Sequence, residues 1–508
     1  MKVYRIDESL NIYTKSQLRD ILSEKALRND NSLKLLSCID LLELNELKER
    51  LKLEDQRFLL VLVLHSLSSG ERSYFATPLK EGQTFFSCRD YWSGAESFEQ
   101  EISLRYGIKF YLDERVTYDY LDFNKSFYQI DYQDSQADMS YESDLNQTIE
   151  QRNEFLLDDY YPLGQRVKFM VHEDDENISK IEVSHSKNIF LDKFLRKKST
   201  KEVIHYLNSI SSRYSFVYEN LWRETYEVIN EVRVDLYQKS LRMLFTELNY
   251  GKNSLEILRD SFYVSGEYNY SNIINQLVFK INSSLEDSKM YKGQKFIINY
   301  DKTFPLLAQW KSNLTSMLKE VTENLIDIRE SISKINRLKE FNFGDQELNL
   351  VRLGLTGASL REFGIRYDIR DCDSYYLYRD LERDRPLGVD GSFYDRLLVK
   401  IQDSIQSFSD VIRIIESLPF KQDVDSFEIK EVIRDQDCIF YSYTESVLGE
   451  VSYLSTIKAQ TSEIYDMFIN TPSQFLLEAF KNVKRPHDYH LVALDWVSMG
   501  ICHEELSR

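Results

Sequence analysis

The sequence has few cysteines, prolines and glycines for its length. Its 508 residues include only five Cys, seven Pro and 16 Gly. The cysteines form no C-x-x-C pair, which is typical of reduced thiols in a cytosolic protein and leaves no cysteine framework for iron–sulfur or zinc. The low Pro and Gly counts argue against long linkers and low-complexity tails. These counts indicate a folded, cytosolic chain.

A long hydrophobic run is also lacking. The longest apolar segment, Phe58–Leu64, falls far short of the roughly 20 residues that a transmembrane helix needs. The first residues, Met1-Lys-Val-Tyr-Arg-Ile-Asp, turn polar at once and do not resemble a cleavable leader. We therefore expect a cytoplasmic protein that reaches a membrane only through partners.

Positive charge is in short supply. The chain has 64 Lys and Arg against 83 Asp and Glu, a net charge of −19. An acidic surface repels phosphate backbones, so nucleic acid is excluded as an expected ligand. No phosphate-binding glycine loop, nucleotide fingerprint or G-x-S-x-G elbow is present either.

The histidines give a weak metal signal. His487-x-x-His490 and Cys502-His503 contain residue types that bind zinc. Such spacing is common by chance and no second cysteine supports it, so we predict no metal site. His65, in an apolar strand, and His205, in a helix, are interpreted as structural or surface residues.

The N-terminal third alternates between helical and strand patterns. Apolar residues from Leu10 to Leu53 recur at helical spacing, including Leu35 and Ile39, which predicts helix. Residues 58–64, 73–79 and 84–87 are predicted to be strands of one sheet, and a helix is predicted within residues 97–110. A polar stretch without periodicity, residues 134–151, is typical of a linker.

The remainder predicts two strands followed by long helices. Residues 166–171 and 180–183 favour strands around an acidic turn, Glu173–Glu176. Apolar residues then recur every three to four positions from Leu314 to Leu338 and from Ile401 to Leu418. This spacing places them on one face of a helix, which predicts two long helices that pack in a bundle.

One stretch carries a recognisable signature. Gly357-Ala-Ser-Leu-Arg-Glu-Phe-Gly-Ile-Arg-Tyr-Asp-Ile-Arg370 is followed by Pro386-Leu-Gly-Val-Asp-Gly-Ser-Phe-Tyr-Asp-Arg-Leu-Leu-Val-Lys400. It resembles the motifs G-x-x-L-R-x-x-G-I-x-[WY]-D-x-R and P-x-G-x-x-G-x-x-Y-D-R-x-L-V-[RK] of the D-type subunit of the NADH:quinone oxidoreductases (complex I). That family is related to the nickel–iron hydrogenase large subunit.

A second stretch is similar to the C-type subunit of the same complexes. Glu99, Glu101, Tyr106, Gly107 and Phe110 match the pattern E-[RQ]-E-x-x-x-x-[FY]-G-I-x-F, although the G-H-P-D-L-R-R segment that normally follows is absent. A C-like half followed by a D-like half is the order of fused C/D subunits.

The resemblance implies an α+β fold in two domains. Residues 1–133 would form a small α/β domain like the C-type subunit, and residues 134–157 a linker. Residues 158–508 would form a mainly α-helical domain, like the hydrogenase large subunit, with peripheral β-strands. Tyr443, Glu445, Gly449, Glu450 and Tyr453 are similar to a hairpin motif of that family.

The resemblance also implies a quinone site that has lost its polar contacts. In the family, a His in H-P-x-x-H-G and a Tyr in R-x-D-Y hold the quinone oxygens. The corresponding residues here are Leu163 and Phe216, which cannot form hydrogen bonds. A His-Arg pair near the terminal iron–sulfur cluster becomes Asn188-Ile189, and an R-P-G-G-V loop becomes residues 299–303 without its glycines.

The metal ligands of the related hydrogenases are missing as well. Those enzymes hold nickel and iron with two C-x-x-C pairs, one starting near the position of Ser215 and one near the C-terminal tail. Neither pair exists here, and Cys502 is solitary. We therefore expect no cofactor in this chain.

Charged residues of the family motifs are retained better in this sequence than the quinone-site residues. Charged residues in a helical core are normally paired and hydrogen-bonded, so a structural network is favoured over a proton relay. The matched residues are Arg213, Arg242, Glu247, Arg361, Asp368, Arg370, Asp395 and Arg396.

The function implied by the resemblance is that of a divergent C/D-like subunit in a complex-I-related membrane-bound assembly. It would bridge peripheral and membrane arms, contacting iron–sulfur and membrane-arm subunits on the cytoplasmic side of the inner membrane, without catalytic residues of its own. The alternative is an active NADH:quinone oxidoreductase subunit, in which Tyr160, Tyr161, Tyr214 or Tyr218 replaces the lost donors. The sequence leaves open whether the chain takes part in catalysis.

Overall fold

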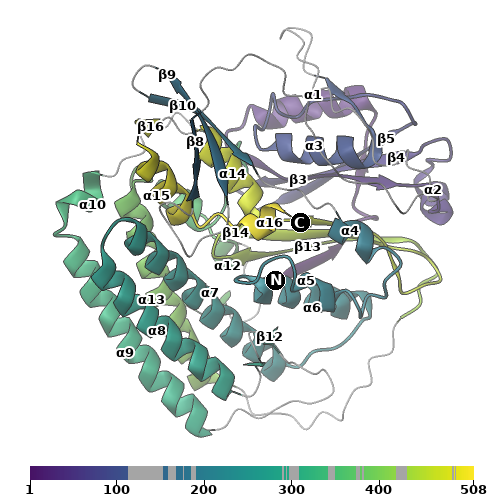
Figure 1. Ribbon diagram of the computed structural model, residues 1–508. Helices are drawn as coiled ribbons and strands as arrows, with labels where there is room; N and C mark the ends of the chain where they lie inside the picture. Colours follow the sequence, from purple (N-terminus) through teal and green to yellow (C-terminus); the bar gives the residue numbers. More distant parts are fainter. Residues whose placement is uncertain are drawn as a thin grey trace, which may run out of the picture.

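The computed structural model combines helices with several β-sheets (Figure 1). It describes residues 1–111, 153–157, 167–174, 177–184, 190–288, 291–292, 295–296, 308–340, 349–372, 378–379, 381, 383–418, 432–482, 485–486 and 488–507.

The first sheet lies in the N-terminal part of the chain and has the strand order β2-β5-β4-β3. Its members are β2 (Asn11–Ile12), β3 (Asn31–Asp40), β4 (Phe58–Ser66) and β5 (Arg72–Leu79). Helices α1 (Lys15–Ala26) and α3 (Ala95–Tyr106) cover one face, and α2 (Asn45–Leu51) follows β3 (Figure 1). Strand β4 and helix α3 confirm the sequence predictions for these segments.

Two predictions for this region were wrong. Residues 33–40, expected to be helical, belong to strand β3, all ten residues of which are buried. A strand covered on both faces carries apolar residues without strict alternation, so Leu35 and Ile39 matched a helical spacing by coincidence. Strand β6 (Phe85–Phe86) pairs with β7 (Phe110–Tyr111) in a separate sheet instead of joining β4 and β5.

A second sheet lies at the centre of the molecule, with the order β1-β13-β14-β15. It contains β1 (Lys2–Arg5), β13 (Cys438–Ser446), β14 (Gly449–Ile457) and β15 (Ile464–Asn470). Every residue of β13 and β14 is buried. These strands form the predicted hairpin. The β-strands of this domain were expected at its periphery, but this sheet is central, with both of its faces covered.

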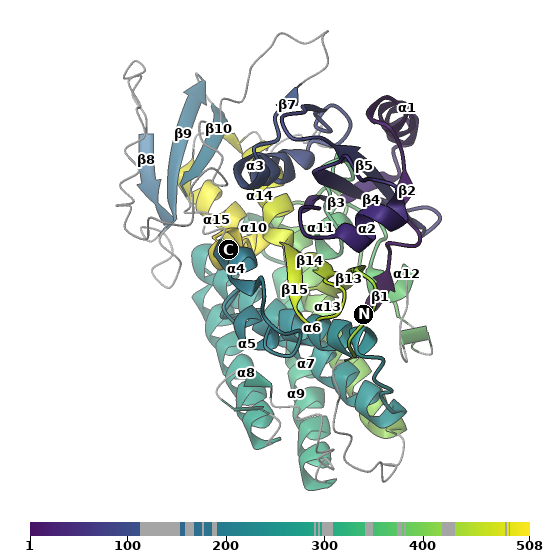
Figure 2. The same ribbon diagram turned by 90° about the vertical axis from the view of Figure 1, so that its right-hand side faces the viewer.

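A third sheet, of order β16-β10-β9-β8, lies at the edge of the molecule (Figure 2). It contains β8 (Asn153–Leu156), β9 (Lys168–Asp174), β10 (Asn177–Ser184) and β16 (Arg485–Pro486). Strands β9 and β10 confirm the predicted pair around the acidic turn. Strand β8 falls within the predicted linker, most of which lies outside the described residues.

Four long helices form a bundle below the sheets (Figure 2). They are α7 (Leu236–Val264), α8 (Tyr268–Asp287), α9 (Ala308–Ile332) and α13 (Phe393–Ser417). The apolar face predicted for residues 314–338 is buried along α9, but the single helix expected there ends at Ile332, and α10 (Asn336–Glu340) follows after a break. Gly251 of α7 allows the close approach of α13, since a Cβ there would lie 2.5 Å from the Phe408 ring.

Shorter elements complete the described fold. They are α4 (Phe190–Leu195), α5 (Ile204–Leu207), α6 (Ser215–Ile229), α11 (Ala358–Arg361), α12 (Ile369–Cys372), α14 (Pro472–Asn482), α15 (Tyr489–Met499), α16 (His503–Leu506), β11 (Tyr291–Lys292) and β12 (Lys295–Phe296). Buried apolar side chains from the N-terminal sheet to the bundle form one continuous core. Strand β1 pairs with β13, so the start of the chain is built into the C-terminal half.

Candidate functional site

The start of α6 holds the first predicted site position. Phe216, which is predicted to stand where the family has a tyrosine, is the second residue of α6 and is 5% exposed. Its ring belongs to the continuous core. Because a phenyl ring lacks a conventional donor or acceptor, this position offers a ligand no hydrogen bond.

Several other predicted positions cannot be located. Leu163, Tyr160 and Tyr161 lie outside the described residues, as do the pair Asn188-Ile189 and the loop 299–303. The structure therefore describes one of the two expected quinone-contact positions.

Tyr214 and Tyr218, two of the proposed substitute donors, are buried on either side of Phe216 in the sequence. The Tyr218 hydroxyl donates to Glu505 Oε1 at 2.7 Å. Burial and the nearby Glu505 raise the pKa of Tyr218 well above its usual value, and burial raises the pKa of Tyr214 beside Arg213. Both phenols stay protonated, and the Tyr218 hydroxyl already donates a hydrogen bond to the Glu505 carboxylate.

The C-terminal tail packs against the start of α6. Cys502 Sγ lies 3.5 Å from Ser211 Oγ, and Ser212 Oγ donates to Glu504 Oε1 at 2.9 Å. The resemblance predicts that these two regions correspond to those that carry the metal-binding cysteines in the nickel–iron hydrogenases. The fold thus brings the two regions together, with a serine and a single thiol at their contact.

The residues at this contact are poor metal ligands. Burial raises the pKa of Cys502 to about 12, so its thiol stays protonated, whereas metals bind the thiolate. His490 Nε2 lies 2.7 Å from the Val264 carbonyl oxygen, and His487 is outside the described residues. Within the described ranges, no three His, Cys, Asp or Glu side chains are placed to hold a metal ion.

Four of the predicted charged residues meet in one buried cluster beside the bundle. Arg361 donates to both carboxylate oxygens of Asp403, at 2.6 and 2.8 Å. Arg370 donates to Asp368 at 2.8 and 2.9 Å and to Glu247 at 3.2 Å. We call this group the bundle cluster; its members are Glu247, Arg361, Asp368, Arg370, Arg383, Arg385, Asp403 and Asp410.

The bundle cluster contains four guanidinium groups and four carboxylates, and the more exposed carboxylate of Asp371 also pairs with Arg385 at 2.8 Å. Burial opposes ionisation of Glu247, but Arg370, Arg383 and Arg385 outweigh it and lower the pKa of that carboxyl. The pKa of Asp368 is lowered for the same reason. Burial raises the pKa of Asp410 to about 6 despite the neighbouring Arg383. Most of the cluster is therefore permanently charged, which is the behaviour of a structural network.

The sequence prediction missed half of this cluster, namely Arg383, Arg385, Asp403 and Asp410. The sequence contains one pattern that could have identified Asp403 and Asp410. Arg396, Lys400, Asp403, Ser407 and Asp410 recur every three to four residues along α13, and all of them are buried. A polar stripe at helical spacing indicates a polar contact inside the core.

The other four predicted residues lie in separate local contacts. Arg242 forms two hydrogen bonds with Glu227, and Arg213 donates to Asp260 at 2.8 Å. Arg396 pairs with Asp495 and donates to Ser498 Oγ at 3.0 Å. Asp395 accepts the backbone N–H groups of Val389 and Asp390, each at 3.1 Å, and so holds the signature loop 386–391. The predicted network is thus one large cluster and several independent pairs.

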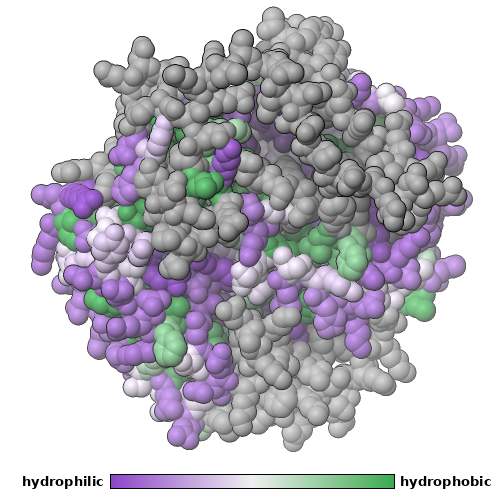
Figure 3. All heavy atoms as spheres, viewed as in Figure 1, coloured by the Kyte–Doolittle hydropathy of each residue, from purple (hydrophilic) through white to green (hydrophobic). Residues whose placement is uncertain are grey.

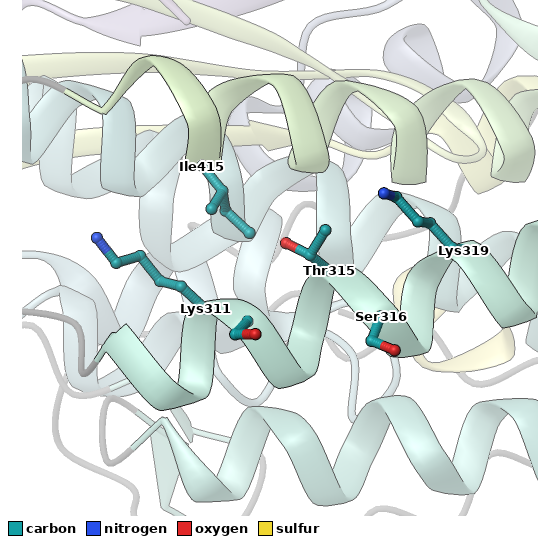
Figure 4. Close-up of a pocket in the computed structure, with 6 residues that line it drawn as sticks. Lys311, Thr315, Ser316, Lys319 and Ile415 are labelled. Atoms are coloured by element: carbon teal, nitrogen blue, oxygen red, sulfur yellow. The ribbon is translucent and has the colours of Figure 1, made fainter.

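Two shallow grooves lie on the bundle, away from these charged groups. One has a volume of about 400 Å³ between α9 and α13, with Lys311 and Lys319 at its ends and Thr315 and Ile415 between them (Figure 4). The second, of about 480 Å³, lies between α8 and α9 beside Trp310. Lysines line both grooves, and neither groove is lined by a histidine or cysteine.

The visible surface is mixed in character. In Figure 3 hydrophilic residues cover much of the exposed bundle, with hydrophobic residues scattered among them. No helix in the described part of the chain combines the length and the hydrophobicity needed to cross a membrane.

Comparison with known sequences identifies relatives of the signature-bearing region. Residues 301–467 match the family model of the respiratory-chain NADH dehydrogenase 49 kDa subunit. A D-type subunit of the NADH-quinone oxidoreductase of Roseiflexus sp. (strain RS-1) is 30% identical over 233 residues, covering 43% of this chain and 62% of that protein. The C/D-type subunit of the NADH-quinone oxidoreductase of Sulfurihydrogenibium sp. (strain YO3AOP1) is 31% identical over 132 residues, covering 24% of this chain and 22% of that protein.

A solved structure has a similar fold. A chain of the membrane-bound sulfane sulfur reductase, an archaeal respiratory membrane complex, matches with a TM-score of 0.59 over 70% of this chain and 98% of that chain. The sequence identity is 16%, so the likeness concerns the fold. The match to the first curated relatives spans 60–62% of their length. These findings confirm the resemblance that the motifs indicated.

Proposed function

Since this chain is related to the D-type subunit of the respiratory NADH dehydrogenases, we propose that it is a divergent C/D-like subunit of a complex-I-related membrane assembly. It would bridge the peripheral and membrane arms on the cytoplasmic side. Iron–sulfur subunits and membrane-arm subunits would be its partners, and quinone would not be held by the usual residue pair.

The observation that carries this proposal is the contrast between Phe216 and the bundle cluster. Phe216 is buried at the start of α6 without hydrogen-bonding atoms in its side chain, whereas the family uses a tyrosine there. A developing quinol oxyanion in a dry pocket needs a donor. The bundle cluster keeps its ion pairs intact. The scaffold is retained while a catalytic contact is absent.

Purification from native membranes tests the assembly. We expect a tagged chain to co-purify with subunits that carry iron–sulfur ligands and with integral membrane subunits, identified by mass spectrometry. A chain that elutes alone and monomeric from gently solubilised membranes contradicts the proposal.

Restoring the missing donor tests the degenerate site. Phe216→Tyr adds one hydroxyl at the position where the family has it. We expect the wild-type assembly not to reduce a water-soluble quinone analogue, and the variant to bind that analogue more tightly in a displacement assay. Phe245→Tyr on α7 is the matched control. Rapid quinone reduction by the wild-type assembly would reject the degenerate-site proposal.

A second candidate function is an active quinone site with a substituted donor. The buried phenols Tyr214 and Tyr218, next to Phe216 in the sequence, support it. In that case Tyr214→Phe or Tyr218→Phe should lower kcat for quinone reduction by about 10²–10⁴-fold, the range for loss of a general acid. Tyr263→Phe on α7, whose ring packs against Tyr268, is a suitable control.

A further inference from the structure

The groove between α9 and α13, here called the α9–α13 groove, is lined by cationic and hydroxyl side chains. Lys311 and Lys319 of α9 lie at its two ends, with Ile415 of α13 between them (Figure 4). The other lining side chains are the hydroxyls of Ser312, Thr315 and Ser316. Among the described residues no carboxylate lines this groove, although the whole chain has 83 acidic against 64 basic residues. The groove is therefore a local site of positive charge on an acidic protein.

Helix α9 fixes how the two lysines are arranged. Residues 311, 315 and 319 follow one another at four-residue intervals, so they share one face of the helix. Figure 4 shows the side chains of Lys311 and Lys319 extending toward α13, with Thr315 pointing toward α13 between them. Eight residues of helix span about 12 Å. Because α9 runs unbroken from Ala308 to Ile332, the two lysines are held at this spacing along its axis.

No neighbouring carboxylate neutralises these lysines in the part of the chain that the structure describes. Lys280, in the adjacent groove between α8 and α9, pairs with Glu320 at 2.6 Å. Lys311 and Lys319 form no such ion pair with any described residue. Glu323, one turn beyond Lys319, is exposed and makes no described ion pair either. Two positive charges thus face the groove without a partner among the described side chains.

The lining favours a protein segment as the occupant. Ile415 is the one apolar side chain described in the lining and is half-buried, so the groove presents no exposed apolar group for insertion into lipid. The net charge of −19 repels a polyanionic nucleic acid. A peptide supplies both kinds of group that the lining calls for, carboxylates for the ammonium groups and backbone carbonyls for the hydroxyls.

We propose that the α9–α13 groove is the docking site for an acidic segment of a partner protein. The segment carries two carboxylates about 12 Å apart, which pair with Lys311 and Lys319, and an uncharged stretch between them that covers Thr315 and Ile415. A helix with acidic residues eight positions apart meets this spacing, as does an extended segment with acidic residues four positions apart. The proposal does not require the partner to belong to a complex-I-related assembly.

Photo-crosslinking of the full-length chain in its native cells tests the groove. Thr315→p-benzoylphenylalanine places a photoreactive group between the lysines, and mass spectrometry identifies the captured segment. We expect that segment to carry two carboxylates at the stated spacing. Adding Lys311→Glu/Lys319→Glu should lower its capture at least about tenfold, because attraction becomes repulsion. Equal capture in the presence of this double change overturns the proposal, as does crosslinking to lipid alone or to nothing.

A matched control separates the groove from net charge. Lys201→Glu/Lys334→Glu makes the same change of charge at two exposed lysines outside the groove and should leave capture unchanged. An equal fall in capture for this control overturns the proposal.

Charge exchange tests direct pairing. Changing the two carboxylates of the captured segment to lysine should restore capture by Lys311→Glu/Lys319→Glu. If that double variant does not fold, the single changes Lys311→Gln and Lys319→Gln keep the test decisive. Each should lower capture about twofold to fivefold, the range for one partly exposed ion pair. Failure of the charge exchange between folded proteins, or single variants that capture as the wild type does, overturns the pairing.

Discussion

At the scale of single residues, burial and partners decide which acids carry a charge. Glu99 on α3 is 2% exposed and accepts hydrogen bonds from Ser87 Oγ at 2.8 Å and from the Cys88 N–H at 2.6 Å. No cation lies within ion-pair distance in the described contacts, and burial raises the pKa of Glu99 to about 8. Glu247, equally buried, meets Arg370 and Arg383 and has its pKa lowered. Identical side chains thus differ in charge.

This contrast predicts how stability depends on pH at Glu99. Between about pH 5 and pH 8 Glu99 holds a proton in the folded chain that it releases in the unfolded chain. The contribution of Glu99 to the free energy of unfolding therefore falls as the pH rises. Glu99→Gln removes this pH dependence of the free energy of unfolding. We expect the variant to gain stability relative to the wild type as pH increases, by at most about 1.4 kcal/mol per pH unit. Urea unfolding across this range measures the difference.

A surface acid on the same helix provides the control. Glu96 pairs with Arg89 at 3.0 Å, and its side chain is 27% exposed. We expect the stability difference between Glu96→Gln and the wild type to stay constant over the same pH range. A constant difference for Glu99→Gln as well would show that its carboxyl ionises normally in the folded chain.

At the scale of elements, the contact between α7 and α13 depends on one small residue. A Cβ on Gly251 would lie 2.5 and 2.8 Å from ring carbons of Phe408. Ser254 Oγ, one turn further along α7, donates to the Lys400 carbonyl oxygen at 3.0 Å. The two helices therefore approach closely at Gly251, with the Phe408 ring filling the space that a side chain would need.

Gly251→Ala should destabilise the protein even though alanine favours helix. The propensity gain is about 1 kcal/mol, whereas overpacking a core contact costs about 1–3 kcal/mol. We expect a net loss in the free energy of unfolding, measured by urea denaturation. The double variant Gly251→Ala/Phe408→Leu should lose less than the sum of its single changes, because the smaller side chain leaves room for the methyl group. A loss in the double variant equal to the sum of the two single losses would argue against a steric clash between the added methyl group at position 251 and the Phe408 ring.

At the scale of the whole molecule, an ion pair joins the two halves of the chain. Arg72 belongs to the N-terminal sheet and Glu450 to the central hairpin, and both side chains are almost fully buried. The Arg72 guanidinium also stacks over the Tyr443 ring, with its carbon 3.4 Å from the ring centroid. With the continuous core and the β1–β13 pairing, this contact joins the N-terminal sheet to the central sheet.

Breaking this pair should weaken the entire fold. Arg72→Met leaves Glu450 buried without its cation, and we expect a loss of about 3–5 kcal/mol. Replacing both residues by methionine should recover most of that loss, because no uncompensated charge remains. Thermal unfolding should stay a single transition in each variant, at a lower temperature for Arg72→Met. Separate transitions for the two halves would refute the idea of one cooperative unit.

The sequence alone determined the resemblance to D-type subunits, the long helices and most strands, because these depend on local patterns. The motif around Gly357–Arg370 and the apolar spacing along α9 needed no tertiary information. The lack of a hydrogen-bonding group at Phe216 also followed from the sequence, since a side chain without polar atoms cannot form a hydrogen bond in any fold. Arg361, Asp368 and Arg370 are paired in the structure, which is the state that the cost of burying single charges favours.

Tertiary structure decided which residues became partners. It made residues 31–40 a strand, because the sheet is covered on both faces and the local spacing fitted helix equally well. It added Asp403 and Asp410 from α13 to the bundle cluster, and it brought Cys502 to Ser211 across 291 positions of the chain. Lys34 and Glu445 are far apart in sequence and contact opposite ends of the segment 354–357, Lys34 at Gly354 and Glu445 at Gly357. Burial and long-range contact set their charges, and neither can be read from neighbouring residues.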